Sequence, residues 1–179
     1  MTNDEWILVG QAKQGDAHAF ARLYERYYHD LYRFAYCYMQ QAEAAEDAVM
    51  NSIEKAYVRL GDLRKNSSFK SWLYQITANE CRAQLRKMPV YMEDANPPEP
   101  RYEESGYSTP EIRELLSHLS EIERLVITLS VFSGYNSSEI AALLHKRPGS
   151  IRSIKSRALS SLRTQVEQSK SRKEVSLHE

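Results

Sequence analysis

The chain has 179 residues and a mass of 20.8 kDa, which fits one ordinary domain or two small ones and excludes a large multidomain enzyme. Lysine plus arginine and aspartate plus glutamate number 24 each, and the resulting net charge of zero, if evenly spread, argues against a uniformly basic nucleic-acid-binding surface. Hydrophobic residues make up 42% of the chain, but no apolar run reaches the roughly 18 residues of a membrane span, so we expect a soluble protein with a core.

The first part of the chain, residues 1–87, carries three helical patterns and no secretory signal, because its start is acidic and lacks a basic segment followed by an apolar one. Apolar side chains recur at spacings of three and four residues, which places them on one face of a helix. The three stripes are Phe20, Leu23, Tyr24, Tyr27, Leu31, Phe34, Ala35 and Tyr38; Ala45, Val49, Ile53, Ala56, Tyr57 and Leu60; and Phe69, Trp72, Leu73, Ile76 and Ala83. Gly61 and Asp62 end the second helix, and residues 66–68 offer an N-cap for the third. No segment alternates as a strand does, so we expect an all-α bundle.

Charge in this part of the chain is segregated. Residues 43–54 contain four acidic residues and no basic one, and such a face suits a basic protein partner or is simply solvated. By contrast, residues 59–87 contain seven basic residues and two acidic ones, interleaved with Phe69, Trp72 and Tyr74. Amines hold phosphates and rings stack on bases, so this mixture suits a nucleic-acid strand. The same aromatic spacing is typical of a helical core, and both roles stay open for Trp72.

Two cysteines and five histidines give no sign of a metal or catalytic site. Cys37 and Cys81 lack the CxxC or Cys/His spacing of a zinc site or a disulfide framework, so we expect two buried thiols and a reducing cytoplasm. The histidines are scattered, and the chain has no GxGxxG, P-loop or HExxH motif. We therefore expect no enzyme activity, no metal and no cofactor.

A linker is expected between residues 88 and 109. Four of the six prolines fall within twelve residues of one another, from Pro89 to Pro100. Residues 88–109 as a whole carry five acidic residues against a single Arg101, with almost no apolar periodicity. Such a composition predicts an extended, flexible and acidic segment.

Residues 110–165 are expected to form a second helical body. Its apolar stripes are Ile112, Leu115, Leu116 and Leu119; Ile122, Leu125, Val126 and Leu129; Ile140, Ala141 and Leu144; and Ile151, Ile154, Ala158 and Leu162. Asn136 followed by Glu139 resembles a capping box before a short helix, residues 145–149 break that helix, and another begins near Ser150. A short helix, a turn with glycine and a polar second helix predict a helix-turn-helix. Residues 166–179 form a polar tail, and we expect its basic part, Lys170–Lys173, to be a disordered extension, with a regulatory handle as the alternative.

The predicted second helix of this motif is basic. Six basic residues and no acidic one occur from Lys146 to Arg163. A helix that carries arginine and serine four residues apart can lay one polar face in a major groove, where arginine reads guanine edges. The candidate DNA contacts are Lys146, Arg147, Ser150, Arg152, Ser153, Lys155, Ser156 and Arg157. The alternative is a solvated basic helix without a partner.

Together these segments resemble the extracytoplasmic-function (group 4) family of bacterial RNA polymerase sigma factors, over nearly the whole chain to about residue 165. The motifs are Gly15–Phe20 with Leu23 and Tyr24; Ala45–Val49 with Glu54–Tyr57; Ser68–Ile76 with Asn79; and Glu139–Ala141 with Pro148–Ser153, Arg157 and Ala158. Each motif alone is weak, but the four stand in the family's order and at its spacing. The opening motif resembles a helix that covers residues 12–28.

The resemblance implies an alternative sigma factor that binds core RNA polymerase and directs transcription from promoters with −35 and −10 elements. It implies two helical bundles, domain 2 in residues 1–87 and the helix-turn-helix domain 4 in residues 110–165, joined by the acidic linker. The implied polymerase contacts are Glu46, Asp47, Met50, Asn51 and Glu54, and the implied −10 contacts are Arg64, Asn66, Ser67, Ser68, Lys70, Trp72, Asn79, Arg82 and Arg86. An anti-sigma factor, often membrane-anchored, is a further implied partner, and no small-molecule substrate is implied.

The chain departs from the family pattern at several positions. Met50 and Asn51 stand where the family usually has Gln and an acidic residue. Ile154 stands where many relatives carry a second basic residue, which predicts a −35 contact set that is reduced or shifted to Lys155. A free-standing helix-turn-helix regulator, with residues 1–87 as a sensing or dimerising bundle, is the alternative from another functional class. Such a regulator binds a palindromic operator without polymerase.

Overall fold

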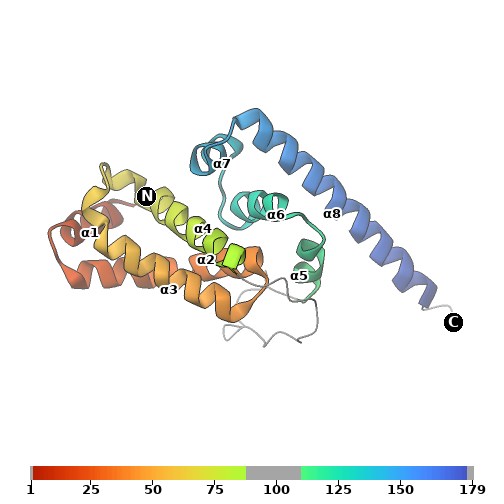
Figure 1. Ribbon diagram of the computed structural model, residues 1–179, viewed down its shortest axis with the longest axis horizontal. Helices are drawn as coiled ribbons and strands as arrows, with labels where there is room; N and C mark the ends of the chain where they lie inside the picture. The colour runs from red at the N-terminus through yellow and green to blue at the C-terminus, as the bar shows by residue number, and fades with distance from the viewer. Residues whose placement is uncertain (1, 88–109, 177–179) are drawn as a thin grey trace. The chain divides into compact units, whose positions relative to one another are not determined.

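The computed structural model describes residues 2–87 and 110–176, and within these ranges all regular elements are helices (Figure 1). The expected all-α fold is thereby confirmed. The chain divides into two compact units, Met1–Pro100 and Arg101–Glu179. The flexible acidic linker expected between residues 88 and 109 lies outside the described residues.

The first unit is a bundle of four α-helices and two short 3₁₀ helices. The elements are α1 (Asn3–Lys13), α2 (Ala17–Met39), α3 (Ala42–Val58), η1 (Leu60–Asp62), η2 (Asn66–Ser68) and α4 (Phe69–Lys87). Helix α3 packs against both α2 and α4, and α1 packs against α2 (Figure 1). Large aromatic side chains fill the centre, where Phe34, Tyr38 and Tyr74 are almost completely buried.

Most of the apolar stripes of the first unit face its core. Every residue of the α2 stripe is buried except Tyr24, which is half-buried. Cys37 and Cys81 are buried free thiols, as expected, and burial raises the pKa of each to about 12. The assignment of Tyr57 to the core was wrong, because its side chain is 52% exposed and only one edge of its ring meets Phe20.

The start of the chain differs from the sequence-based expectation of a helix over residues 12–28. Helix α1 ends at Lys13, and Gly15 adopts a left-handed conformation (φ 95°) that L side chains rarely take. Asp16 then caps α2, since its carboxylate accepts hydrogen bonds from the backbone N–H groups of His18 (2.9 Å) and Ala19 (3.1 Å). The glycine and aspartate of the opening motif therefore separate two helices.

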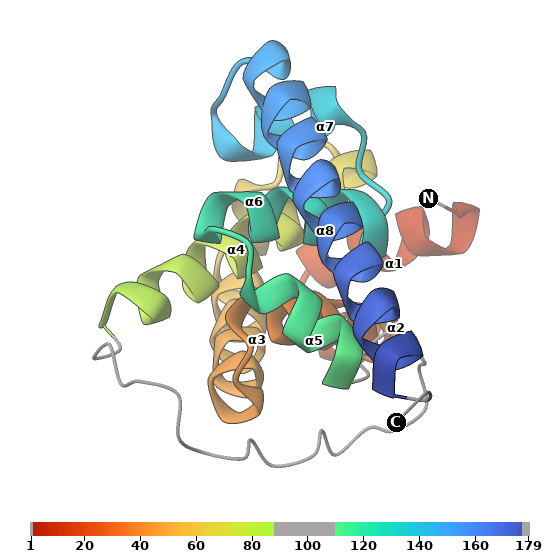
Figure 2. The same cartoon turned by 90° about the vertical axis from the view of Figure 1, so that its right-hand side faces the viewer.

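The second unit consists of α5 (Pro110–Ser117), α6 (Glu121–Ile127), a π-helical turn η3 (Thr128–Phe132), α7 (Ser137–Leu144) and α8 (Pro148–Ser176). Helices α5, α6 and α7 each contact α8, and Figure 2 shows them spaced along its length. Leu125, Leu129, Ile140 and Ile151 form the centre of the core. The apolar pattern of this part of the sequence is therefore largely confirmed.

Helix α8 is longer than the sequence led us to expect. It begins at Pro148, a residue whose fixed φ suits the first position of a helix, and it continues to Ser176 (Figure 1). The expected disorder of Lys170–Lys173 was wrong, because these residues belong to α8: the sequence after Gly149 contains no helix breaker, and Arg163 forms an ion pair with Glu167 one turn away. Leu162, expected in the core, is only half-buried.

Candidate nucleic-acid and protein interfaces

Helices α7 and α8 form a helix-turn-helix, and both ends of α7 are capped. The Asn136 side chain accepts hydrogen bonds from the N–H groups of Ser138 and Glu139, and the Glu139 carboxylate accepts one from the Asn136 N–H (2.7 Å), so the expected capping box is confirmed. At the other end, His145 takes a left-handed conformation (φ 52°) that reverses the chain before α8. The beginning of α8 is thereby held at a defined angle to α7.

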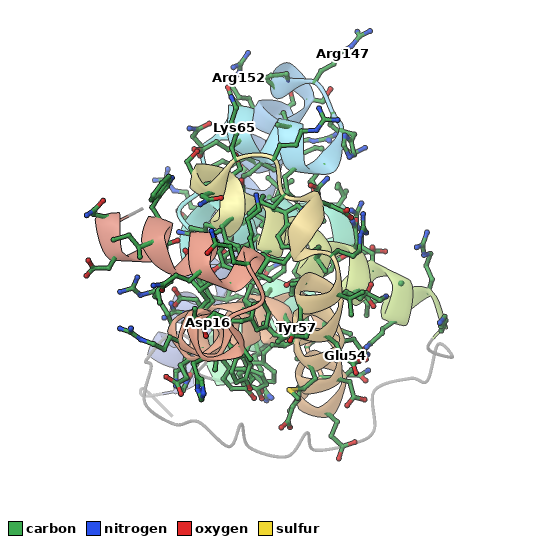
Figure 3. The ribbon with its side chains drawn as sticks, turned by 90° about the vertical axis from the view of Figure 1, so that its left-hand side faces the viewer. Asp16, Glu54, Tyr57, Lys65, Arg147 and Arg152 are labelled. Atoms are coloured by element: carbon green, nitrogen blue, oxygen red, sulfur yellow. The ribbon has the colours of Figure 1, made fainter. Side chains whose placement is uncertain are left out.

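The exposed face at the start of α8 carries most of the predicted −35 contacts. Figure 3 shows Arg147 and Arg152 pointing away from this end of the unit. The exposed predicted contacts are Lys146, Arg147, Ser150, Arg152, Ser153, Ser156 and Arg157. The opposite side of the same helix is buried through Ile151, Ile154 and Ala158. The structure thus separates a polar, basic face from an apolar one, as the helical period requires.

Some of these side chains are already engaged inside the unit. Lys155 is half-buried and its ammonium group donates a hydrogen bond to the Ser130 hydroxyl, so it turns toward η3 and away from the exposed face. The Ser153 hydroxyl donates to the Gly149 carbonyl (3.1 Å). The pKa of Glu123 lies below its ordinary value because Ser120 donates hydrogen bonds to its carboxylate and, to a smaller extent, because Arg157 is nearby. Arg147 and Arg152 are therefore the clearest candidates for base or phosphate contacts.

The predicted −10 contacts divide between a loop and one face of α4. The loop contacts lie at η2, which contains Asn66, Ser67 and Ser68, and Arg64 lies just before it. Figure 3 shows Lys65 projecting from the same loop. On α4, the residues that share one face by helical spacing are Trp72, Asn79, Arg82 and Arg86. The Asn79 side-chain oxygen accepts a hydrogen bond from the Arg82 guanidinium (2.6 Å).

Lys70 and Trp72 lie on different sides of α4. Lys70 lies on the opposite side of the helix from Asn79, and its ammonium group stands 5.9 Å from the centroid of the Tyr74 ring. The structure therefore does not bring Lys70 together with the other predicted α4 contacts. Trp72 is half-buried and its ring lies 6.2 Å from that of Phe69, so its position is compatible with a partly exposed platform at the edge of the core.

The predicted protein-binding residues form one surface on α3. Asp47, Met50, Asn51 and Glu54 are exposed and Glu46 is half-buried. Tyr57 and Val58, exposed by 52% and 79%, extend this surface toward the end of the helix, and Figure 3 labels Glu54 and Tyr57 on it. Sequence reasoning missed Val58 and placed Tyr57 in the core. The resulting surface, called the α3 face below (residues 46–58), combines carboxylates with exposed apolar groups, as interfaces with proteins do.

Two comparisons with known proteins decide the family. The model of Sigma-70 region 2 matches residues 23–88, and that of Sigma-70 region 4 matches residues 109–162. The ECF RNA polymerase sigma-E factor of Escherichia coli (strain K12) is 31% identical over 180 aligned residues, which cover 90% of this chain and 93% of that protein. The chain belongs to the extracytoplasmic-function sigma factors of the sigma-70 family. It is thus an alternative sigma factor that directs transcription initiation.

Other relatives agree with this identification. The RNA polymerase sigma-H factor of Pseudomonas aeruginosa is 29% identical over 164 residues, which cover 82% of this sigma factor and 85% of that one. CnrH, solved in complex with the cytosolic domain of CnrY, superposes with a TM-score of 0.71 at 22% identity and covers 93% of this chain and 99% of its own. The sigma factor RpoE of Bartonella quintana, solved with the anti-sigma factor NepR, gives a TM-score of 0.70 at 24% identity over 83% and 96% of the two chains. Both structures share the fold of this sigma factor.

The identification bears on the alternatives raised by the sequence. A free-standing helix-turn-helix regulator is not favoured, because the N-terminal bundle matches the sigma region 2 model. Sigma factors are not enzymes in the catalytic sense. Within residues 2–87 and 110–176, none of the helices has the length and apolarity needed to cross a membrane.

Proposed function

We propose that this sigma factor divides its contacts among three surfaces on two domains. Residues 1–87 form domain 2, which binds core polymerase and the −10 element, and residues 110–165 form domain 4, which binds the −35 element. In support, α4 ends at Lys87 and α5 begins at Pro110. Residues 88–109 connect the two as an acidic linker that runs toward the polymerase active centre and RNA exit path, and the polar tail of residues 166–179 follows domain 4.

Domain 4 reads the −35 element in the duplex through the exposed face of α8. The observation that carries this assignment is the separation of charge in the helix-turn-helix, where Arg147 and Arg152 stand outward while the apolar side of α8 is buried. Arg152 lies in the second turn of α8, at the depth from which a recognition helix reaches base edges. Lys146 and Arg147 precede the helix and contact phosphates. Ser150, Ser153, Ser156 and Arg157 complete the contact face, and Lys155 supports it from within.

Domain 2 holds the melted −10 strand between the loop of residues 64–68 and the α4 face defined by Trp72, Asn79, Arg82 and Arg86. The loop offers short polar side chains that suit the edge of a flipped base, and the arginines of α4 suit its backbone. Lys70, on the other side of α4, contributes to the electrostatic field near the strand without sharing this face.

The α3 face docks on core polymerase. Its exposed carboxylates complement a basic partner, and the exposed Tyr57 and Val58 supply apolar area that gains from being covered. Met50, whose sulfur accepts a hydrogen bond from the Tyr24 hydroxyl (3.9 Å), links this face to α2. The α3 face is also the surface that an anti-sigma factor would cover, and the solved complexes of CnrH and of Bartonella RpoE support such a partner. We place the sigma factor in the cytoplasm, where polymerase is found.

Run-off transcription with reconstituted core polymerase tests the assignment of surfaces. Arg152→Ala is expected to weaken −35-dependent initiation by about five-fold or more, since a bidentate contact to a base contributes roughly 1–3 kcal/mol. Arg163→Ala is the matched control, because Arg163 is exposed on the same helix beyond the helix-turn-helix and pairs with Glu167. Equal activity of the two variants at a −35-dependent promoter would refute the domain 4 assignment.

The α3 face is tested by a charge reversal. Glu54→Lys is expected to reduce the affinity for core polymerase, measured by competition with a labelled sigma factor, while Glu25→Lys, the same change at an exposed position of α2, leaves it unchanged. If both variants bind core polymerase as the wild type does, the α3 face is not the docking surface.

A further inference from the structure

One face of α1 lies against the loop that joins α3 to α4. The Lys13 ammonium group donates a hydrogen bond to the Leu63 carbonyl (2.6 Å), and the Asn66 side-chain amide donates one to the Trp6 carbonyl (3.4 Å). Between these two contacts, a Cβ atom at Gly10 would stand in ordinary van der Waals contact, 3.4 Å from the Asn66 amide nitrogen, so Asn66 lies close to the helix along this face. Residues 6, 10 and 13 share one face because they are spaced by four and three.

Helix α1 is itself firmly attached to the core. The Tyr27 hydroxyl of α2 donates a hydrogen bond to the Glu5 carboxylate, and both side chains are buried. The Tyr27 ring lies edge-on to Phe69, the first residue of α4, with 5.6 Å between the ring centroids. Helix α1 therefore holds the loop of residues 59–68 in place from one side, and the loop leads directly into α4 at its other end.

The N-terminal end of the same α1 face carries an exposed aromatic ring. The Trp6 side chain is 54% exposed although its backbone carbonyl holds Asn66. Arg64 and Lys65, which directly precede Asn66 in the loop, are exposed as well. An exposed indole ring on α1, and an amide and two exposed cations on the loop that contacts the Trp6 carbonyl, are the kinds of groups that bind single-stranded nucleic acid, where rings stack on bases and cations hold the backbone.

We propose that Trp6 stacks on an unpaired base of the melted promoter strand, directly beside the base edge that Asn66 contacts. The hydrogen bond to the Trp6 carbonyl uses the Asn66 amide nitrogen, so the amide oxygen can accept a hydrogen bond from an exocyclic amine of a base. Helix α1 is then part of the strand-binding surface and not only a support. This inference rests on the proposed role of domain 2, and the surface is continuous with the loop assigned to it.

Single-stranded DNA is favoured over a protein as the occupant because the loop that contacts the Trp6 carbonyl carries two exposed cations, Arg64 and Lys65, which match a phosphate backbone. The exposed charges of the α3 face are mainly carboxylates, Asp47 and Glu54 against Lys55, whereas the loop that contacts the Trp6 carbonyl carries these two exposed cations. The loop next to α1 therefore suits a partner of negative charge.

Photo-crosslinking in the open complex tests the contact directly. Polymerase holoenzyme with the full-length sigma factor is assembled on a promoter mapped from its transcript start, with a photoreactive nucleotide placed at each position of the non-template strand in turn. Trypsin releases residues 1–13 as one peptide, because Lys13 is the first basic residue of the chain. We expect crosslinks from one or two adjacent positions to this peptide. Crosslinks from the strand to other peptides of the sigma factor or to polymerase subunits, with none from any position to residues 1–13, would overturn the proposal.

The lifetime of the open complex tests whether the contact contributes to binding. Trp6→Ala is expected to shorten it by roughly five-fold or more, as the loss of one base–aromatic stack requires, and Trp6→Phe to restore most of it. Ile7→Ala removes the neighbouring exposed apolar side chain from a different face of α1 and is expected to have no effect. Equal lifetimes for Trp6→Ala and wild type, or equal losses for Trp6→Ala and Ile7→Ala, would overturn the proposal. Absence of promoter-specific transcription by the wild type would instead count against the proposed function.

Discussion

The buried pair of Glu5 and Tyr27 makes the attachment of α1 testable by a single substitution. Tyr27→Phe removes the hydroxyl that donates to the Glu5 carboxylate, and both side chains are more than nine-tenths buried, with exposures of 5% and 6%. A buried acceptor that loses its donor costs about 1–3 kcal/mol, and more when it is charged. For a domain the size of residues 2–87, a loss of about 2 kcal/mol lowers Tm by roughly 8–16 °C.

Tryptophan fluorescence isolates this effect in the full-length chain. Trp6 and Trp72 are the two tryptophans of the sequence, and both belong to domain 2, so their emission reports the unfolding of that domain alone. We expect Tyr27→Phe to lower the urea midpoint of the fluorescence transition. Tyr24→Phe is the control, since it removes a hydroxyl from the same helix where the hydrogen bond, to the Met50 sulfur, is exposed, and we expect it to change stability by less than about 0.5 kcal/mol.

A double substitution separates the buried hydrogen bond from the ring packing. Tyr27→Phe combined with Glu5→Met leaves no unsatisfied carboxylate, so it is expected to recover a large part of the stability lost by Tyr27→Phe alone. If Tyr27→Phe unfolds at the same urea concentration as the wild type, the hydrogen bond does not fasten α1. If the double variant is no more stable than Tyr27→Phe, the loss arises from packing against Phe69 and not from the stranded carboxylate.

Three further predictions follow from domain 4 and from the thiols. The pKa of Glu123 is lower in the folded chain than its ordinary value of 4.5, so the ionised carboxylate stabilises the fold above that pH, and this stabilisation is lost as the pH falls through the folded pKa. In hydrogen exchange, the α6 amides of Glu123→Gln should be less protected than those of the wild type at neutral pH and equally protected in strong acid. Cys37 and Cys81, with pKa values raised to about 12, should resist iodoacetamide in the native chain at neutral pH and react when urea unfolds it, as measured by mass; rapid native modification would contradict their burial. Lys146→Ala should reduce the slope of log affinity against log salt for −35 duplex by about one, with unchanged sequence preference; a changed preference would make Lys146 a base contact.

Sequence reasoning succeeded where local rules act alone. The α2 stripe was predictable because large apolar residues repeat at the helical period, and nearly all of them are buried. The turn before α7 was predictable because Asn136 and Glu139 satisfy each other's backbone groups within four residues. A second capping box, Ser120 with Glu123 at the start of α6, follows the same rule and was overlooked.

The rest depended on contacts between distant parts of the chain. Helix α1 has four consecutive apolar residues from Trp6 to Val9 and no periodic stripe, and its position is set by Tyr27, 22 residues beyond Glu5. Lys155 reads as a DNA contact in the sequence, but Ser130, 25 residues earlier, holds it toward η3. Tyr57 follows Ile53 by four residues, yet it lies at the edge of the buried face: Ala56, one residue before it, is fully buried, while Phe20 meets only one edge of the Tyr57 ring. Periodicity shows which face a residue occupies but not where the partner of that face ends.

Although the net charge is zero, the charged residues of the proposed interfaces are not paired with one another within the described residues. The ion pairs found among the described residues are Arg33–Asp30, Lys55–Glu80, Arg59–Asp62 and Arg163–Glu167. None of them, within this part of the chain, engages a carboxylate at position 46, 47 or 54 or a guanidinium at position 147 or 152. The free chain therefore presents an acidic field that opposes DNA together with the basic field that attracts it. If polymerase covers the α3 face, as proposed, it removes the first field and fixes the distance between the two proposed DNA-binding domains, so that DNA affinity rises only after polymerase has bound.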